Sequence, residues 1–176
     1  MTAPANAATI AILMKAKILL VAVVIGIVAA GAFALSPKSA APEVRFTALS
    51  GENFSTSDLR GKVVLVNFWA TWCTTCVEEM PRMIDTYRKF APQGYEMVAV
   101  AVQSDHPNSV AAFAQKRALP FRIALDGDGA IAKEFGRVRI TPTSFLIDKN
   151  GRVIKEYVGE PDWAEFHALI EKALAS

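Results

Sequence analysis

The chain has 176 residues, a formal net charge of +2 and a hydrophobic fraction of 52%. That length favours one domain with an appendage, and the apolar fraction is larger than one such domain needs. Three of the 19 basic residues precede the first acidic residue, Glu43, so the remaining chain carries 16 basic and 17 acidic side chains. The chain has no basic cluster with interleaved aromatics, which argues against a nucleic-acid-binding protein.

The excess of apolar residues lies near the N-terminus, where residues 18–35 carry no charged side chain. As a helix they span roughly 27 Å, at about 1.5 Å per residue, which is close to the hydrocarbon thickness of a bilayer. Because Lys15 and Lys17 precede this run, we expect residues 1–17 in the cytoplasm, an anchor at 18–35 in the inner membrane, and a periplasmic domain. A cleaved signal peptide is the alternative, since residues 30–34 contain small-x-small cleavage patterns.

Residues 36–42 contain two prolines and are predicted to be an extended linker, followed by one domain over residues 43–176. The first expected elements are a hairpin at 43–55, a turn at 58–62, a strand at 63–68, and a helix that begins at the two cysteines and ends near 90. A strand at 95–102, a helix at 108–117, a strand at 121–125 and a short helix at 130–135 follow. The chain ends with a hairpin of strands at 144–148 and 153–158 and a last helix from a capping box at Asp162 and Glu165 to about 175. This order predicts an α/β sandwich with helices on both faces of a mixed central sheet.

Both cysteines, Cys73 and Cys76, lie where the strand at 63–68 passes into the next helix. A Cys-x-x-Cys pair in this position is typical of a redox motif. The unpaired N–H groups and the positive pole of the helix N-terminus stabilise a thiolate, so we expect the pKa of Cys73 to fall from about 8.5 toward roughly 3.5–7.5. Cys73 then attacks a substrate disulfide, and Cys76 resolves the mixed disulfide.

The motif at 67–76, the segments at 78–81 and 140–148, and their order along the chain resemble the thioredoxin superfamily with its three-layer sandwich. Within it they are similar to redoxin (AhpC/TSA-like) proteins of the membrane-tethered TlpA/ResA branch, over residues 43 to the C-terminus. The resemblance implies an extracytoplasmic thiol–disulfide oxidoreductase that reduces exported cysteine-containing proteins such as apocytochrome c. A membrane thiol electron donor recharges such proteins. We expect a monomer with no metal and no cofactor besides the Cys73–Cys76 disulfide.

The resemblance also assigns roles to residues around the pair. Thr141-Pro142 matches a cis-proline dipeptide that lies against the disulfide and binds the substrate strand through its backbone. Glu79 matches a glutamate that exchanges protons with the thiols, although a solvated carboxylate on the helix surface is the alternative. Trp72 and Trp69 are expected to shield the disulfide, and core packing explains Trp69 equally well.

Two positions depart from the pattern of the wider superfamily. Asn67 stands where many cytoplasmic thioredoxins carry a buried aspartate, and an amide cannot accept a proton, so that task passes to Glu79 or to water. Thr74 and Thr75 replace a dipeptide that commonly ends in proline. Because this dipeptide tunes a potential that ranges from about −270 to about −120 mV, the direction of electron flow stays open.

Three other functions compete with the reductant. A disulfide oxidase or isomerase is one, but strongly oxidising relatives generally carry a histidine between the cysteines. A copper-handling module is another, since Cys-x-x-Cys can be half of a metal site, yet His106 and His167 are too distant to complete it and are expected to have surface or packing roles. Ala70 replaces the threonine expected in a peroxiredoxin, and the intact pair argues against a non-catalytic adaptor.

Overall fold

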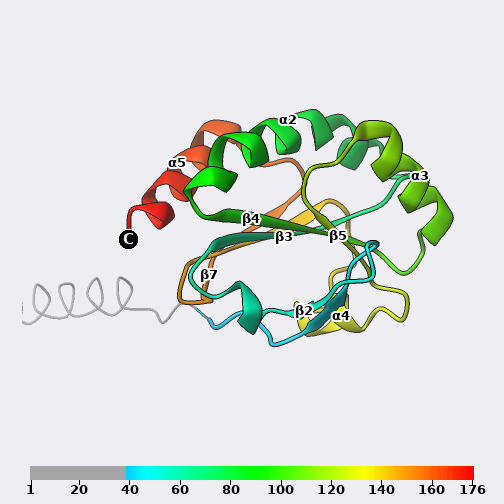
Figure 1. The fold of residues 1–176 in the computed structure, drawn as a ribbon, viewed down its shortest axis with the longest axis horizontal. Coiled ribbons are helices and arrows are strands. Elements are labelled where there is room, and N and C mark those ends of the chain that lie inside the picture. Colours follow the sequence, from blue (N-terminus) through cyan, green and yellow to red (C-terminus); the bar gives the residue numbers. More distant parts are fainter. Residues whose placement is uncertain (1–38) are drawn as a thin grey trace, which may run out of the picture. The chain divides into compact units, whose positions relative to one another are not determined.

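The computed structural model of the protein describes residues 39–176, which form a five-stranded sheet and a separate two-stranded hairpin (Figure 1). The order across the sheet is β5-β4-β3-β6-β7. Its strands are β3 (Val63–Trp69), β4 (Tyr95–Ala101), β5 (Arg122–Leu125), β6 (Thr143–Ile147) and β7 (Val153–Val158). Strand β4 is parallel to both β3 and β5, and β6 is antiparallel to both β3 and β7. The predicted mixed sheet is thus confirmed.

The remaining elements cover the two faces of this sheet unequally. They are β1 (Arg45–Thr47), β2 (Asn53–Ser55), η1 (Ser57–Leu59), α2 (Thr74–Phe90), η2 (Ala91–Gln93), α3 (Pro107–Arg117), α4 (Ala130–Glu134) and α5 (Trp163–Leu174). The long helices α2, α3 and α5 pack on one face, whereas the β1–β2 hairpin, η1 and the short α4 pack on the other (Figure 1). Helices therefore lie on both faces, as predicted, but within residues 39–176 the second face has a single short α-helix, α4.

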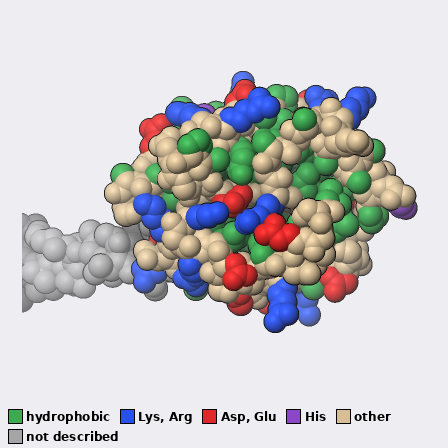
Figure 2. All heavy atoms as spheres, viewed as in Figure 1, with side chains coloured by type: hydrophobic (Ala, Val, Ile, Leu, Met, Phe, Trp, Pro, Cys, Tyr) green, Lys and Arg blue, Asp and Glu red, His purple; other side chains and the backbone are tan. Residues whose placement is uncertain are grey.

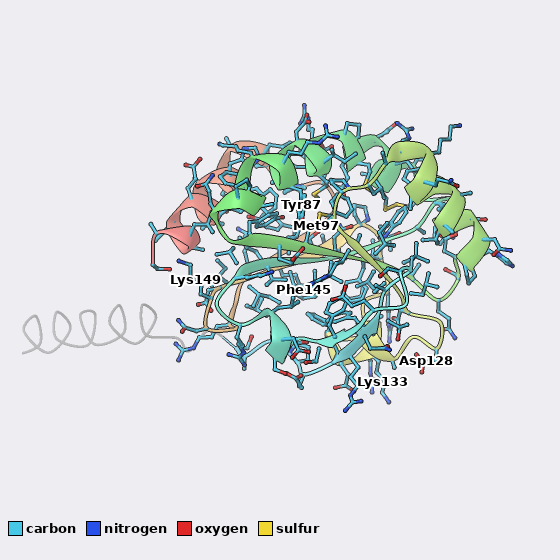
Figure 3. All side chains as sticks on the ribbon, in the orientation of Figure 1. Tyr87, Met97, Asp128, Lys133, Phe145 and Lys149 are labelled. Carbon is cyan, nitrogen blue, oxygen red and sulfur yellow. A yellow bond between two sulfur atoms is a disulfide. The ribbon has the colours of Figure 1, made fainter. Side chains whose placement is uncertain are left out.

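Two apolar layers result from the alternation of side chains along the strands. Along β3, Leu65 and Trp69 face α2, while Val66 and Phe68 face the hairpin and α4. Figure 3 shows Met97 of β4 on the α2 side of the sheet and Phe145 of β6 on the opposite side. Since each such side chain contributes about 1.5–3 kcal/mol on full burial, the two layers hold the central strands in place.

Residues 39–41, which the sequence assigned to the linker, already pair with the domain. The N–H of Ala41 donates to the carbonyl of Gly151, and the N–H of Val153 donates to the carbonyl of Ser39. The predicted anchor at 18–35 lies outside the described residues. Within residues 39–176, no helix is both long and apolar enough to span a membrane.

The last helix begins somewhat differently from the predicted capping box. Asp162 caps α5 as expected, since its carboxylate accepts the N–H of Glu165 at 2.9 Å. The carboxylate of Glu165 instead accepts a hydrogen bond from Lys155 of β7 at 2.8 Å. Only the Asp162 half of the capping box forms, because a cation on the neighbouring strand offers Glu165 a stronger, charge-assisted partner.

Candidate functional site

The two cysteines lie at the point where β3 ends and α2 begins. Cys73 is the N-cap residue of α2, and its Sγ accepts the N–H of Cys76 at 3.3 Å. The two residues form a disulfide. Cys73 is 8% exposed and Cys76 is fully buried, so Cys73 is the sulfur that a substrate can reach. This asymmetry fits attack by Cys73 and resolution by Cys76, because access decides which sulfur reacts first.

The turn between β3 and Cys73 is held by Asp105, which follows β4. One oxygen of Asp105 accepts the backbone N–H of Thr71 at 2.6 Å, and the other accepts the Thr71 hydroxyl at 2.7 Å. Trp72, the next residue, is 60% exposed, whereas Trp69 is buried and packs on Phe113. Core packing therefore accounts for Trp69, and of the two tryptophans only Trp72 presents its ring on the surface beside Cys73.

The Thr141–Pro142 peptide bond is cis, as the resemblance implied. Strands β3 and β6 are antiparallel, and Phe68 pairs with Thr143. The chain therefore leaves β3 and enters β6 at the same end of the sheet. The carbonyl of Pro142 accepts the N–H of Gly159 at 2.8 Å. Within the described part of the chain, the backbone N–H and C=O of Thr141 have no hydrogen-bond partner, so they are free to pair with a substrate strand.

A line of buried polar side chains lies beneath the disulfide. Asn67 of β3 donates through Nδ2 to Ser144 Oγ at 2.8 Å and to Glu79 Oε1 at 3.4 Å. Asn67 and Ser144 are direct cross-strand partners, so their side chains share the face that α2 covers. Glu79 lies one turn after Cys76 on that helix, and residues three apart on a helix are neighbours. The helical spacing therefore places a buried carboxylate on the same face of α2 as the buried sulfur.

Glu79 is 2% exposed, which contradicts the solvated carboxylate considered from the sequence. Burial raises the pKa of Glu79 to about 8, the hydrogen bond from Asn67 opposes this rise, and the charge of Glu160 adds to it. Among residues 39–176, Glu79 Oε2 has no hydrogen-bond partner. Glu79 can thus hold a proton at neutral pH on Oε2, which has no hydrogen bond to any other described residue.

The other sequence-predicted residues lie near the pair or away from it. Thr74 and Thr75 form the exposed first turn of α2. His106 caps α3, accepting the N–H of Asn108 at 3.3 Å, and His167 contacts Thr86 at 2.8 Å on the far end of α2. Both histidines have the structural roles expected of them. No group of three or more possible metal ligands occurs in the part of the chain that the structure describes.

Sequence reasoning missed Ser144 and Asp105 as members of the site. Neither belongs to the Cys-x-x-Cys motif, and each reaches it through strand register or a loop rather than through sequence proximity. The one signal in the sequence was their position relative to predicted strands, since Ser144 begins one strand and Asp105 follows another. In the structure both lie at the end of the sheet where β3 passes into the active-site turn.

Comparisons with known proteins agree with this geometry. A family model described as Redoxin matches residues 36–171. The chain is 39% identical over 133 residues to thiol-disulfide oxidoreductase ResA of Bacillus thuringiensis subsp. konkukian, covering 75% of each chain. It is 37% identical over 130 residues to ResA of Bacillus subtilis, covering 74% of this chain and 72% of that protein. A crystal structure of a thiol:disulfide interchange protein from Chlorobium tepidum superposes with a TM-score of 0.72 at 28% identity, covering 79% of this chain and 98% of that one.

Proposed function

The chain belongs to the Redoxin family and is a thiol–disulfide oxidoreductase, and we propose that it works outside the cytoplasm as a reductant of exported proteins such as apocytochrome c. The observation that carries the proposal is the difference in access between Cys73, which is 8% exposed at the helix N-terminus, and Cys76, which is fully buried. The relatives named ResA support the oxidoreductase chemistry. The absence of a histidine between the cysteines favours reduction over oxidation.

The reaction proceeds in two exchanges from the dithiol form. The Cys73 thiolate attacks one sulfur of a substrate disulfide, so that a mixed disulfide forms and the other substrate sulfur leaves as a thiolate. The Cys76 thiolate then attacks Cys73 Sγ, which forms the Cys73–Cys76 disulfide and releases the second substrate sulfur. Two electrons pass to the substrate, whose thiolates take up two protons. The pair itself carries the electrons, so the cycle needs no metal or prosthetic group.

Glu79 is the group proposed to manage the proton of Cys76. Cys76 must lose a proton before it can resolve the mixed disulfide, and it is buried away from solvent. A neighbouring carboxyl group whose pKa is about 8 can exchange a proton with a thiol near neutral pH. Asn67 donates a hydrogen bond to this carboxyl group, and Ser144 holds the Asn67 amide in place by accepting a second one.

The N-terminal segment is proposed to anchor a monomeric domain on the outer side of the inner membrane. There a membrane thiol donor reduces the Cys73–Cys76 disulfide after each cycle. Thr141-Pro142 binds the substrate strand through the backbone groups of Thr141, which have no hydrogen-bond partner among residues 39–176.

Equilibration of the full chain with glutathione buffers of known ratio tests the direction of electron flow. A potential below about −220 mV supports a reductant, and a value near −120 mV overturns the proposal in favour of an oxidase. A Cys76→Ser variant then identifies substrates, because mixed disulfides on Cys73 cannot be resolved. Recovery of exported cysteine proteins on Cys73 supports the proposed substrate class, whereas a Cys73→Ser variant provides the control for nonspecific capture.

A further inference from the structure

A hollow of about 330 Å³ lies beside the active-site turn. Part of its lining comes from Trp72, which precedes Cys73, and from Thr141, which precedes Pro142. The hollow thus adjoins both elements that a substrate must contact during disulfide exchange. Its volume is at the lower end of the roughly 300–1,000 Å³ of ligand sites, which suits a few side chains of a peptide rather than a folded partner.

Three exposed cations, Lys133, Arg137 and Arg139, also line the hollow. In residues 39–176 none of the three forms an ion pair, and the sequence has no acidic residue before Glu43. Asp128 lies on the same side of the molecule as Lys133 (Figure 3). Its carboxylate, however, accepts the N–H of Ala130 at 3.1 Å and makes no salt bridge to Lys133. None of the three charges is therefore neutralised by an ion pair with another described residue.

One carboxylate, Asp126, belongs to the described lining of this hollow. It is buried, and its two oxygens accept the N–H groups of Ile131 and Ala132, each at 2.9 Å. The lining therefore keeps an excess of two positive charges, although the chain after residue 38 has 16 basic and 17 acidic side chains. On the face seen in Figure 2 the two signs are interspersed. The basic hollow is thus a local feature and not a consequence of overall charge.

The backbone that carries Arg137 is held in an uncommon conformation. Arg137 has a φ of 63°, a left-handed value that few residues other than glycine adopt. Its N–H donates to the carbonyl of Lys133 at 3.1 Å, and the N–H of Val138 donates to that of Ala132 at 3.0 Å. Such conformations persist only where the surrounding structure enforces them, and they are frequent at functional sites.

We propose that this basic hollow binds acidic residues that flank the reactive cysteine of a substrate polypeptide. The inference rests on the proposed reductant function and specifies its substrate class. Carboxylates beside a disulfide repel the attacking Cys73 thiolate, and the cations of the hollow offset this repulsion while they orient the peptide. The chain accordingly reduces disulfides in acidic contexts faster than the same disulfides in neutral ones.

Two synthetic peptides test this preference with the pre-reduced full chain. They share one intramolecular disulfide and differ only in the two residues that flank the attacked cysteine, which are aspartate in one and asparagine in the other. The rate constant of peptide reduction is measured by chromatography in single turnover. The matched variants are R137Q/R139Q, which removes two charges from the hollow, and K116Q/K172Q, which removes two exposed charges from α3 and α5 outside it.

The expected result is a ratio of acidic to neutral rate constants of roughly 2 to 30 at about 10 mM salt, since each exposed ion pair contributes a factor of about 1.4 to 5. The ratio falls toward one at about 0.5 M salt, where charges are screened over a few ångströms. It also falls toward one in R137Q/R139Q and is kept in K116Q/K172Q. A wild-type ratio of one at low salt overturns the inference and leaves the proposed function intact. The same conclusion follows if R137Q/R139Q keeps the wild-type ratio of acidic to neutral rate constants. Failure to reduce either peptide instead refutes the reductant function on which the inference rests.

Discussion

Replacement of Glu79 by glutamine should remove a pH dependence of stability that the wild-type protein carries. Burial raises the pKa of Glu79 from its ordinary 4.5 to about 8. Below pH 4.5 the carboxyl group is protonated in both the folded and the unfolded chain, so it contributes no difference. Between about pH 4.5 and 8 the unfolded chain loses this proton while the folded chain keeps it, and the free energy of unfolding therefore decreases as the pH rises.

The size of this loss follows from the width of the pH window. At about 1.4 kcal/mol per pH unit, the loss approaches roughly 5 kcal/mol by pH 8 and changes no further above it. Glutamine has nearly the same shape as a protonated glutamate but does not titrate. The Glu79→Gln variant should therefore match the wild type near pH 4.5 and exceed it by several kcal/mol at pH 8 to 9.

Urea unfolding of the oxidised protein at several pH values between 4.5 and 9 measures this difference, because the disulfide-bonded cysteines do not titrate. Glu78→Gln serves as the control. Glu78 is exposed on the same helix, so its replacement makes the same chemical change without altering a buried group. Parallel profiles for Glu79→Gln and wild type across the whole range would refute the assigned burial and protonation of Glu79.

Three further substitutions test the contacts around the site by urea unfolding at pH 7. Ser144→Ala leaves the buried amide of Asn67 without its shorter hydrogen bond and should cost about 1–3 kcal/mol; a loss below about 0.5 kcal/mol would contradict this contact. Asp105→Ala removes both acceptors of Thr71 and should cost about 2–3 kcal/mol, while a Thr71→Val variant that loses only the hydroxyl contact should cost less. Asp162→Ala removes the cap of α5 and should cost about 0.5–2 kcal/mol, whereas Asp162→Asn should restore most of it.

The local motifs were readable from the sequence because their physics is local. The apolar run from Val63 to Val66 and the helical spacing after Cys76 were enough to place the cysteines at a strand–helix junction. The Asn-Gly turn and the Asp162 cap likewise depend on residues within a few positions of one another. The structure confirms each of these elements to within one or two residues.

Contacts across the sheet could not be read in the same way. The burial of Glu79 depends on the packing of α2 against β3, and a helix sequence with a carboxylate at this position is equally compatible with a solvated surface. Ser144 became part of the site only through its register opposite Asn67. The basic hollow combines the turn before Cys73 with residues 133–141, which are more than 60 positions apart in the chain.

The sequence by itself determined that a thiol pair sits at the N-terminus of a helix and that the chain has thioredoxin-like elements, because periodicity and caps act over a few residues. Only the tertiary structure decided that Glu79 is buried on the helix that carries the pair, and that three cations without an ion pair among residues 39–176 line the hollow next to the active-site turn. Exposure, pKa and uncompensated charge depend on what surrounds a side chain in space, and strand register and packing, not order along the chain, set those surroundings.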